Sequence, residues 1–238
     1  PTLAEELVRT GVSVIATGGA ELPIFAAKTA TERSNIPVVF VVGGDPVKLG
    51  IVPSLARPGG HLTGVSMFTS ALENKRFGLL HEVVPSSKVF AALVDPGRAV
   101  VGMQIAEVTD ATRQAGVRLV VVRAANESEF AAAFSTAASQ EAGGLQICAS
   151  PNFLPKRQQL VDLAARYRIP TIYEWRDFAE AGGLMSYGTD LADAYRQAGS
   201  YVAKILGGIQ PSDLPVIQSA KFEFVINLKT ARELGFEF

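Results

Sequence analysis

Short apolar runs of strand length alternate with stretches of helical period along the whole chain. The short runs predict strands, and the stretches between them predict helices. Because the strand runs are continuously apolar, helices are expected to cover both faces of each sheet. Alternation at this spacing predicts an α/β fold with parallel, doubly wound sheets and right-handed crossovers. The main predicted strands are residues 12–16, 36–42, 62–65, 89–94, 119–122, 145–149, 170–173 and 222–226, and the clearest helices are 3–10, 21–31, 70–83, 156–167 and 191–206.

Residues 182–190 predict a short buried strand that ends in a polar rim and passes directly into the helix at 191–206. In a parallel α/β sheet, ligands bind at junctions of this kind. Similar junctions follow other predicted strands, at 17–19, 43–46 and 95–97. None of them carries a recognisable catalytic set. The pattern therefore favours a protein that binds a ligand without transforming it.

Composition narrows the class of protein further. The 238 residues suffice for one large domain or two lobes, and 48% of them are apolar while 19% are charged. A net charge of −1 provides no basic field for nucleic acid or for an anionic membrane surface. No apolar run approaches the ~20 residues of a membrane-spanning helix.

Several familiar chemistries are excluded by motif. No two of the 22 glycines are spaced i and i+2, so the dinucleotide-binding fingerprint is absent. The P-loop, the Gly-x-Ser-x-Gly elbow and the His-Glu-x-x-His zinc motif are absent as well. Cys148 is the only cysteine, which excludes an internal disulfide and a thiolate metal cage, and its strand predicts a buried, inert thiol. We predict no cofactor and no metal.

Three strand-end loops are candidate ligand sites. The backbone N–H groups of Thr17, Gly18 and Gly19 precede a helix and could hold a carboxylate, although a plain tight turn is an equal alternative. The carboxylate of Asp45, before Pro46, could bind a ligand amine or simply cap a helix. The same two interpretations apply to the loop Asp95–Pro96–Gly97.

Aromatic residues follow several predicted strands. Phe153, Tyr173 and Tyr187 lie at or just past strand ends, as does Trp175. One such aromatic is usually part of the core, but several at one sheet edge would suit an apolar or aromatic ligand side chain. Beside them, Glu174 could pair with an ammonium group, and an exposed charge is the alternative.

Four separated segments resemble one family, namely residues 43–47, 54–64, 182–188 and 222–231. The sequence resembles the substrate-binding proteins of ABC importers, in the branch related to tryptophan and aromatic amino-acid binders. The resemblance covers essentially the whole chain, although His61 stands where the family motif usually has Asn. It implies a type I periplasmic-binding-protein fold, in which two α/β lobes joined by crossing strands close on a small ligand.

The resemblance also implies how the chain divides. Lobe one is expected to comprise 1–68 plus 189–209, and lobe two 69–188 plus 210–238. Residues 17–20 and 43–46 then belong to the rim of lobe one, and 95–97, 151–153 and 173–175 to that of lobe two. Ser186 and Tyr187 fall near the hinge.

Family members normally begin with a signal sequence followed by a strand, a helix and a second strand, whereas this sequence opens on the following helix. We therefore expect lobe one to lack its first βαβ unit and to expose a strand edge along residues 12–16. A second copy of the chain, or a swapped element, is expected to cover that edge.

The predicted function is that of the solute-binding component of an ABC importer. The expected ligand is an amino acid, aromatic or branched-chain, held between the lobes, and the expected partner is an ABC permease, with no nucleic acid. The protein is expected to be periplasmic or extracellular and attached to a membrane. One alternative is the effector-binding sensor domain of a transcriptional regulator with the same fold. An α/β racemase or epimerase is a weaker one, because no pair of bases can be identified.

Overall fold

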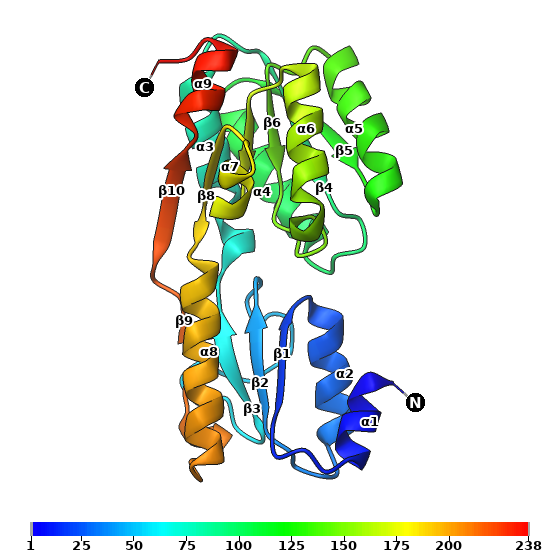
Figure 1. The fold of residues 1–238 in the computed structure, drawn as a ribbon, viewed down its shortest axis with the longest axis vertical. Helices are drawn as coiled ribbons and strands as arrows, with labels where there is room; N and C mark the ends of the chain where they lie inside the picture. Colours follow the sequence, from blue (N-terminus) through cyan, green and yellow to red (C-terminus); the bar gives the residue numbers. More distant parts are fainter. Residues whose placement is uncertain (1, 238) are drawn as a thin grey trace. The chain divides into compact units, whose positions relative to one another are not determined.

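The computed structural model describes residues 2–237, apart from the side chains of residues 70 and 71. The chain forms two compact units (Figure 1). The first comprises the residues up to Phe68 together with Leu191–Lys221. The second comprises Thr69–Asp190 together with the residues from Phe222 onward. Each unit is built around its own sheet.

The first unit contains a four-stranded parallel sheet in the order β1-β2-β3-β9. Its central strand β2 is buried along its whole length, as its run of apolar residues predicts. Alternate residues of a strand point to opposite faces, so both faces of β2 need a cover. The four strands are β1 (Ile15–Gly19), β2 (Val38–Val42), β3 (Leu62–Ser66) and β9 (Ile217–Gln218).

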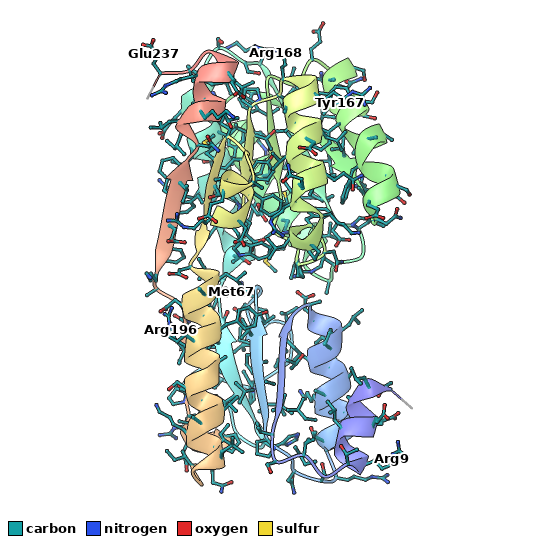
Figure 2. The ribbon with its side chains drawn as sticks, in the orientation of Figure 1. Arg9, Met67, Tyr167, Arg168, Arg196 and Glu237 are labelled. Carbon is teal, nitrogen blue, oxygen red and sulfur yellow. The ribbon has the colours of Figure 1, made fainter. Side chains whose placement is uncertain are left out.

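Helices supply that cover on both faces of the first sheet. Phe40 packs in one cluster with Ile24 of helix α2 (Glu21–Thr31), next to α1 (Leu3–Arg9). Val41 packs on the other face with residues of helix α8 (Leu191–Leu206). The charged side chains labelled in this unit in Figure 2, on Arg9 and Arg196, are exposed, whereas Met67 is buried.

The second unit contains a six-stranded sheet in the order β10-β8-β7-β6-β4-β5. All neighbours are parallel except β10, which runs antiparallel to β8. Because β4 pairs with both β5 and β6, the strand order reverses between β4 and β6, and ligands bind at such switch points. The strands are β4 (Val89–Val94), β5 (Arg118–Arg123), β6 (Gly144–Ile147), β7 (Thr171–Tyr173), β8 (Met185–Thr189) and β10 (Phe222–Ile226).

Helices pack in pairs on this sheet, α3 with α4 and α5 with α6. Phe90 and Ala92 of β4 belong to the apolar clusters that α3 and α4 help to form. The helices of this unit are α3 (Glu73–Val83), α4 (Val101–Gln114), α5 (Glu127–Ser139), α6 (Arg157–Tyr167), α7 (Arg176–Glu180) and α9 (Leu228–Leu234), and single 3-10 turns lie at Thr69–Leu72, Leu154–Lys156 and, in the first unit, Pro211–Asp213.

Most predicted elements are confirmed, and helices 21–31 and 191–206 have the predicted bounds. The first strand is corrected: it begins at Ile15 and continues through Gly19, because its last residues pair with β2. The predicted parallel sheets are confirmed, with one exception: β10 runs antiparallel to β8. Helix α3 begins at Glu73 after Leu72, whose side chain makes no capping hydrogen bond, and the Glu73 carboxylate accepts a hydrogen bond from Gln146.

Residues 210–221 also differ from the expectation, which placed them in the second lobe. They belong to the first unit, because Leu214 packs beside Val41 and β9 pairs with β3. The Thr63 hydroxyl of β3 donates to the Leu214 carbonyl at 2.6 Å, and this hydrogen bond also holds residues 210–221 against the first sheet. Helix α7 and strand β9 were not predicted, since five and two residues are too short for a periodic signal.

Candidate functional site

In the first unit, the predicted loop at Thr17, Gly18 and Gly19 is the last part of strand β1. The three residues are in register with residues 40–42 of β2. They are therefore held at the carboxyl edge of the sheet, as predicted, but as paired strand and not as a free loop or a simple tight turn.

Tyr195 lies against this edge from helix α8. A Cβ atom added to Gly18 would lie 2.8 Å from the Tyr195 hydroxyl oxygen, so the absence of a side chain at Gly18 makes room for the ring. The ring remains 46% exposed. Tyr195 is not among the residues predicted from the sequence, although an aromatic residue in the helix that follows a strand-end rim is a usable signal.

Asp45 forms the turn after β2. Its Oδ1 accepts hydrogen bonds from the backbone N–H groups of Val47 at 2.9 Å and Lys48 at 3.3 Å. Asp45 therefore has the local capping role that was one of its two predicted interpretations, although it caps a turn and not a helix. Pro46 is buried beside it, and the Ser66 hydroxyl at the end of β3 donates to the Gly44 carbonyl at 3.0 Å.

In the second unit, Asp95 follows β4 at the switch point. Its Oδ2 accepts from the Ser150 hydroxyl and from the Asn152 amide, each at 2.8 Å, and its Oδ1 accepts from the Gly97 N–H at 2.9 Å. Asp95 is buried, while the neighbouring Pro96 is exposed. The carboxylate thus joins the loops after β4 and β6, and three donors already occupy its oxygens.

A buried ion pair lies behind this edge. Arg76 and Glu73 of α3 have fully buried side chains, with Nη2 3.0 Å from the Glu73 Oε2. The Arg76 guanidinium also donates to the carbonyl oxygens of Thr69, at 2.7 Å, and Tyr187, at 3.1 Å. Each of its three nitrogens therefore has an acceptor.

The Glu73 carboxylate also has several hydrogen-bond partners besides Arg76. It accepts from the side-chain amides of Gln104 at 2.8 Å and Gln146 at 2.6 Å, and from the Ala149 N–H at 2.9 Å. These donors come from α4, β6 and the loop after β6. This network was not predicted, because only the i, i+3 spacing of Glu73 and Arg76 is visible in the sequence.

Glu174 follows β7 directly and is 3% exposed. The Thr69 side chain hydrogen-bonds to its carboxyl group, while its Oε2 has no hydrogen-bond partner among the described residues. Burial raises the pKa of Glu174 to about 7, opposed mainly by the positive charge of Arg76 and reinforced by the negative charge of Glu73. The predicted alternative of an exposed charge is therefore wrong.

Two more polar groups near this edge lack partners within the described part of the chain. They are the Trp175 Nε1, on the residue after Glu174, and the Ser186 hydroxyl of β8. Ser186 is paired with Tyr173 in the ladder, so it lies within a strand and not at the strand's end. Buried polar groups usually find partners, and such exceptions mark places where a ligand or water can bind.

The aromatic residues do not gather at one edge. Tyr173 is fully buried and stacks on Phe178 with the ring centroids 4.7 Å apart. Phe153 is buried against Phe130. Tyr187 is half-buried in β8, beside the exposed rings of β10. Of the four predicted aromatics, only Trp175 follows the end of its strand next to a candidate polar group.

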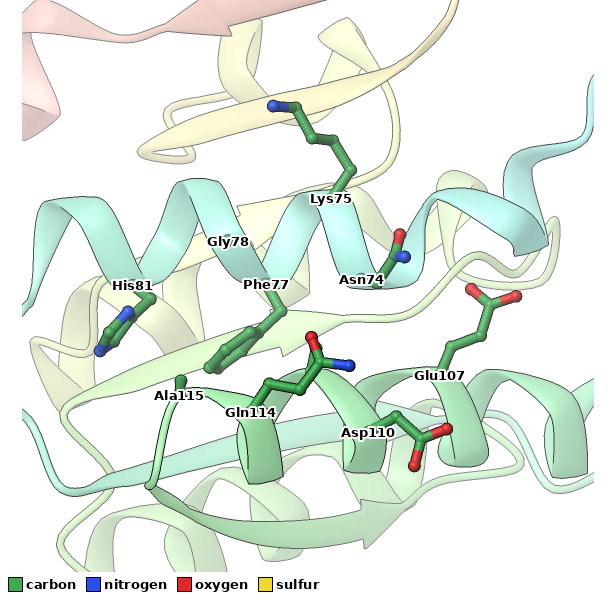
Figure 3. A pocket seen from close by; sticks show the side chains of 10 residues that line it. Asn74, Lys75, Phe77, Gly78, His81, Glu107, Asp110, Gln114 and Ala115 are labelled. Carbon is green, nitrogen blue, oxygen red and sulfur yellow. The ribbon is translucent and has the colours of Figure 1, made fainter.

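A groove of about 680 Å³ lies elsewhere in this unit, between α3 and α4 (Figure 3). Its lining includes Lys75, Phe77, His81, Glu107 and Asp110, and none of the predicted site residues. It is therefore separate from the candidate edge.

The remaining candidates for chemistry have structural roles. Cys148 is buried, and burial raises the pKa of its thiol well above the ordinary value, as expected for an inert core thiol. The Nε2 of His61 lies 2.8 Å from the Thr31 hydroxyl. Within residues 2–237, no group of three or more His, Cys, Asp or Glu side chains is arranged to hold a metal ion. No described helix is long and apolar enough to cross a membrane.

Two sheet-based units, the second doubly wound with polar groups at its carboxyl edge, define an α/β ligand-binding protein of the type I periplasmic-binding-protein fold. The chain belongs to the family described as ABC transporter substrate binding protein, whose family model matches residues 2–238. Proteins of this family bind substrates and are not enzymes. The predicted family and fold class are thereby confirmed.

Similar proteins include a "Tyrosine-binding protein" of Clostridioides difficile (strain R20291), 25% identical over 215 residues. That match covers 89% of this chain, and the chain spans 60% of that relative's length. Among solved structures, an ABC domain from Streptococcus pneumonia in complex with L-Trp has a TM-score of 0.85 and 23% identity, covering 99% of this chain and 80% of that one. A conserved domain protein from Vibrio cholerae has a TM-score of 0.87 and 24% identity, covering 99% of this chain and 77% of that one.

Proposed function

We propose that this chain is the solute-binding component of an ABC importer and that its ligand is an amino acid, aromatic or branched-chain. The observation that carries the proposal is membership of the substrate-binding family over residues 2–238. The ligand class is supported by the relative named for tyrosine binding and by the similar structure in complex with L-Trp.

The carboxyl edges of the two sheets supply the ligand contacts in this proposal. In the second unit, Glu174 and Trp175 offer polar atoms that have no partner within the described part of the chain, and Asp95 lies at the switch point. Ser186 and Pro96 belong to the same proposed set, whereas Tyr173 and Phe153 are buried and Tyr187 is half-buried. In the first unit, the contacts come from Thr17, Gly18, Gly19, Asp45 and Pro46.

The partner in this proposal is an ABC permease, to which the chain delivers its ligand without changing it covalently. Substrate-binding proteins of ABC transporters are extracellular or periplasmic. The site of action proposed for this chain is accordingly the outer side of the cytoplasmic membrane, with attachment to that membrane.

A thermal-unfolding screen against the twenty amino acids, with D-glucose as a neutral comparison, tests the proposal. A ligand that binds only the folded state raises the free energy of unfolding by about 2.7 kcal/mol at one hundred times its Kd. We expect such a shift with L-tyrosine, L-tryptophan or a branched-chain amino acid. A shift with D-glucose alone, or with no amino acid, contradicts the proposed ligand class.

Alanine variants test the site. Asp45→Ala and Glu174→Ala are each expected to weaken amino-acid binding at least tenfold in titration calorimetry. Asp110→Ala is the matched control, because this exposed carboxylate lies on α4 beside the separate groove. Unchanged affinity in both test variants contradicts the site assignment.

A further inference from the structure

We propose that the ligand presents a cationic ammonium group to Glu174, and that its binding releases the proton which this carboxyl group holds in the free protein. The inference rests on the proposed function, that the sheet edges bind an amino acid. It goes further by naming Glu174 as the group that binds the ligand's ammonium, and by predicting how many protons are released when the ligand binds.

The geometry selects Glu174 among the acidic groups at the edges. Asp95 already accepts hydrogen bonds from three donors on its two oxygens, and Asp45 uses one oxygen to hold its own turn. Glu174 Oε2 is buried without a hydrogen-bond donor from the described residues. A buried acceptor without a donor is costly, so a ligand that brings donors gains free energy there.

The surrounding charges leave Glu174 short of a cation. Four titratable groups interact electrostatically with Glu174. The charges of Arg76 and Glu73 on α3 and of Arg98 in the loop after β4 shift the pKa of Glu174, and the charge of Glu174 raises the pKa of Cys148 after β6. Arg76 is paired with Glu73 and donates to two backbone carbonyls, and its charge lowers the pKa of Glu174 by less than burial raises it. The influence of Arg98 on Glu174 is weaker than that of Arg76, and the Cys148 thiol stays neutral because burial raises its pKa.

Protonation resolves this imbalance in the free protein. With a pKa of about 7, Glu174 carries its proton about half of the time at neutral pH. An ammonium group within contact distance favours the carboxylate and lowers that pKa. Binding therefore expels the proton whenever the free protein holds it, and affinity must fall as the pH is lowered below 7.

Titration calorimetry in buffers of different ionisation enthalpy measures this directly. The intact chain is titrated with L-tyrosine and L-tryptophan at pH 6, 7 and 8, where the α-amino group of both ligands stays protonated. We expect the release of nearly one proton per ligand at pH 6, about half a proton at pH 7 and almost none at pH 8. The affinity is expected to fall about tenfold from pH 8 to pH 6.

Three comparisons separate the carboxyl group from other sources of protons. Glu174→Gln keeps the shape of the side chain but cannot ionise, so proton release and the pH dependence of affinity should both disappear. Asp110→Asn, on the exposed face of α4, should retain both. The deaminated analogue 3-(4-hydroxyphenyl)propionic acid should bind at least tenfold more weakly than L-tyrosine at pH 8 and should release no proton.

The outcomes distinguish this inference from the function on which it rests. If amino acids bind tightly with no proton release at pH 6, or if the deaminated analogue binds equally well, the inference is overturned and the proposed function stands. If no amino acid binds at any pH, both fail. Should Glu174→Gln not fold, the proton count of the unaltered chain and the analogue decide the question alone.

Discussion

Arg76 lies behind the carboxyl edge of the second sheet and holds together several segments near that edge. Its guanidinium is fully buried and is held by Glu73 and by the carbonyl oxygens of Thr69 and Tyr187. Thr69 is the first residue of the second unit and Tyr187 belongs to the strand that leaves it, so one cation ties together two segments next to the chain crossings. A buried charge of this kind is tolerated only while its partners remain.

We therefore predict that Arg76→Met destabilises the protein by about 3–5 kcal/mol, because it leaves the buried Glu73 without its cation. Chemical denaturation followed by circular dichroism measures the change. Arg113→Met is the control, since this arginine pairs with Asp110 at the surface and its side chain is 73% exposed. The control should change stability by less than about 0.5 kcal/mol. Equal effects in the two variants would show that the Arg76 network contributes little.

Glu174 predicts a pH dependence of stability as well as of binding. Its pKa in the folded state, about 7, exceeds the ordinary 4.5, so between these values the folded state binds more protons than the unfolded state. The contribution of Glu174 to stability is therefore complete at low pH and is lost as the pH rises from about 4.5 to about 7.

Glu174→Gln cannot ionise, so it removes this loss of stability. The stability of the variant relative to the unaltered chain should therefore increase as the pH rises. The difference in unfolding free energy between variant and unaltered chain should shift by up to about 3 kcal/mol, in favour of the variant, from pH 4 to pH 8. Urea denaturation at the two pH values, without ligand, is the measurement. Parallel pH profiles for the two proteins would contradict it.

At the scale of elements, the strands meet so closely that some positions admit no side chain. A Cβ atom added to Gly64 of β3 would lie 2.0 Å from the Phe40 carbonyl oxygen of β2. The contact is with backbone, so a strand must move to relieve it.

We predict that Gly64→Ala destabilises the protein by about 1–3 kcal/mol or more. Gly199→Ala is the opposite case, because Gly199 is exposed on α8 with nothing within 4 Å of an added Cβ. That change should stabilise the protein by about 1 kcal/mol through helix propensity. Urea denaturation compares the two, and the same sign for both would contradict the prediction.

The elements differ in how far their sequence specified them. Helix α8 was predicted with its bounds because 16 residues carry several turns of amphipathic period. Strand β10 was predicted as a strand, but its antiparallel pairing with β8 depends on a partner more than 30 residues away. The local sequence pattern therefore predicts whether a segment is a helix or a strand, but it does not predict which strand it pairs with in the sheet.

At the scale of the whole molecule, strand β1 is at the edge of the first sheet and pairs only with β2 among the described residues. Unpaired strand edges promote association. The prediction remains that a second copy of this chain, or a swapped element, covers the edge, so the 238-residue chain should sediment as a dimer.

Ala16→Lys places a charge on this edge at an exposed position and should shift the chain toward monomer in sedimentation velocity. Ala203→Lys, on the exposed face of α8, carries the same charge and should leave the dimer intact. If the unaltered chain sediments as a monomer at the highest protein concentration tested, the prediction is refuted.

The sequence by itself determined the α/β class, most of the elements and the family, because apolar periodicity and contiguous motifs are local properties. It also placed Asp95 and Glu174 at strand ends. Only the tertiary structure decided that Asp95 accepts from three donors, that Glu174 Oε2 has no donor among the residues the structure describes, and that Tyr173 belongs to the core. Hydrogen-bond partners and burial depend on segments distant in the chain, such as α3 with β6, and no local pattern records which segments the fold brings together.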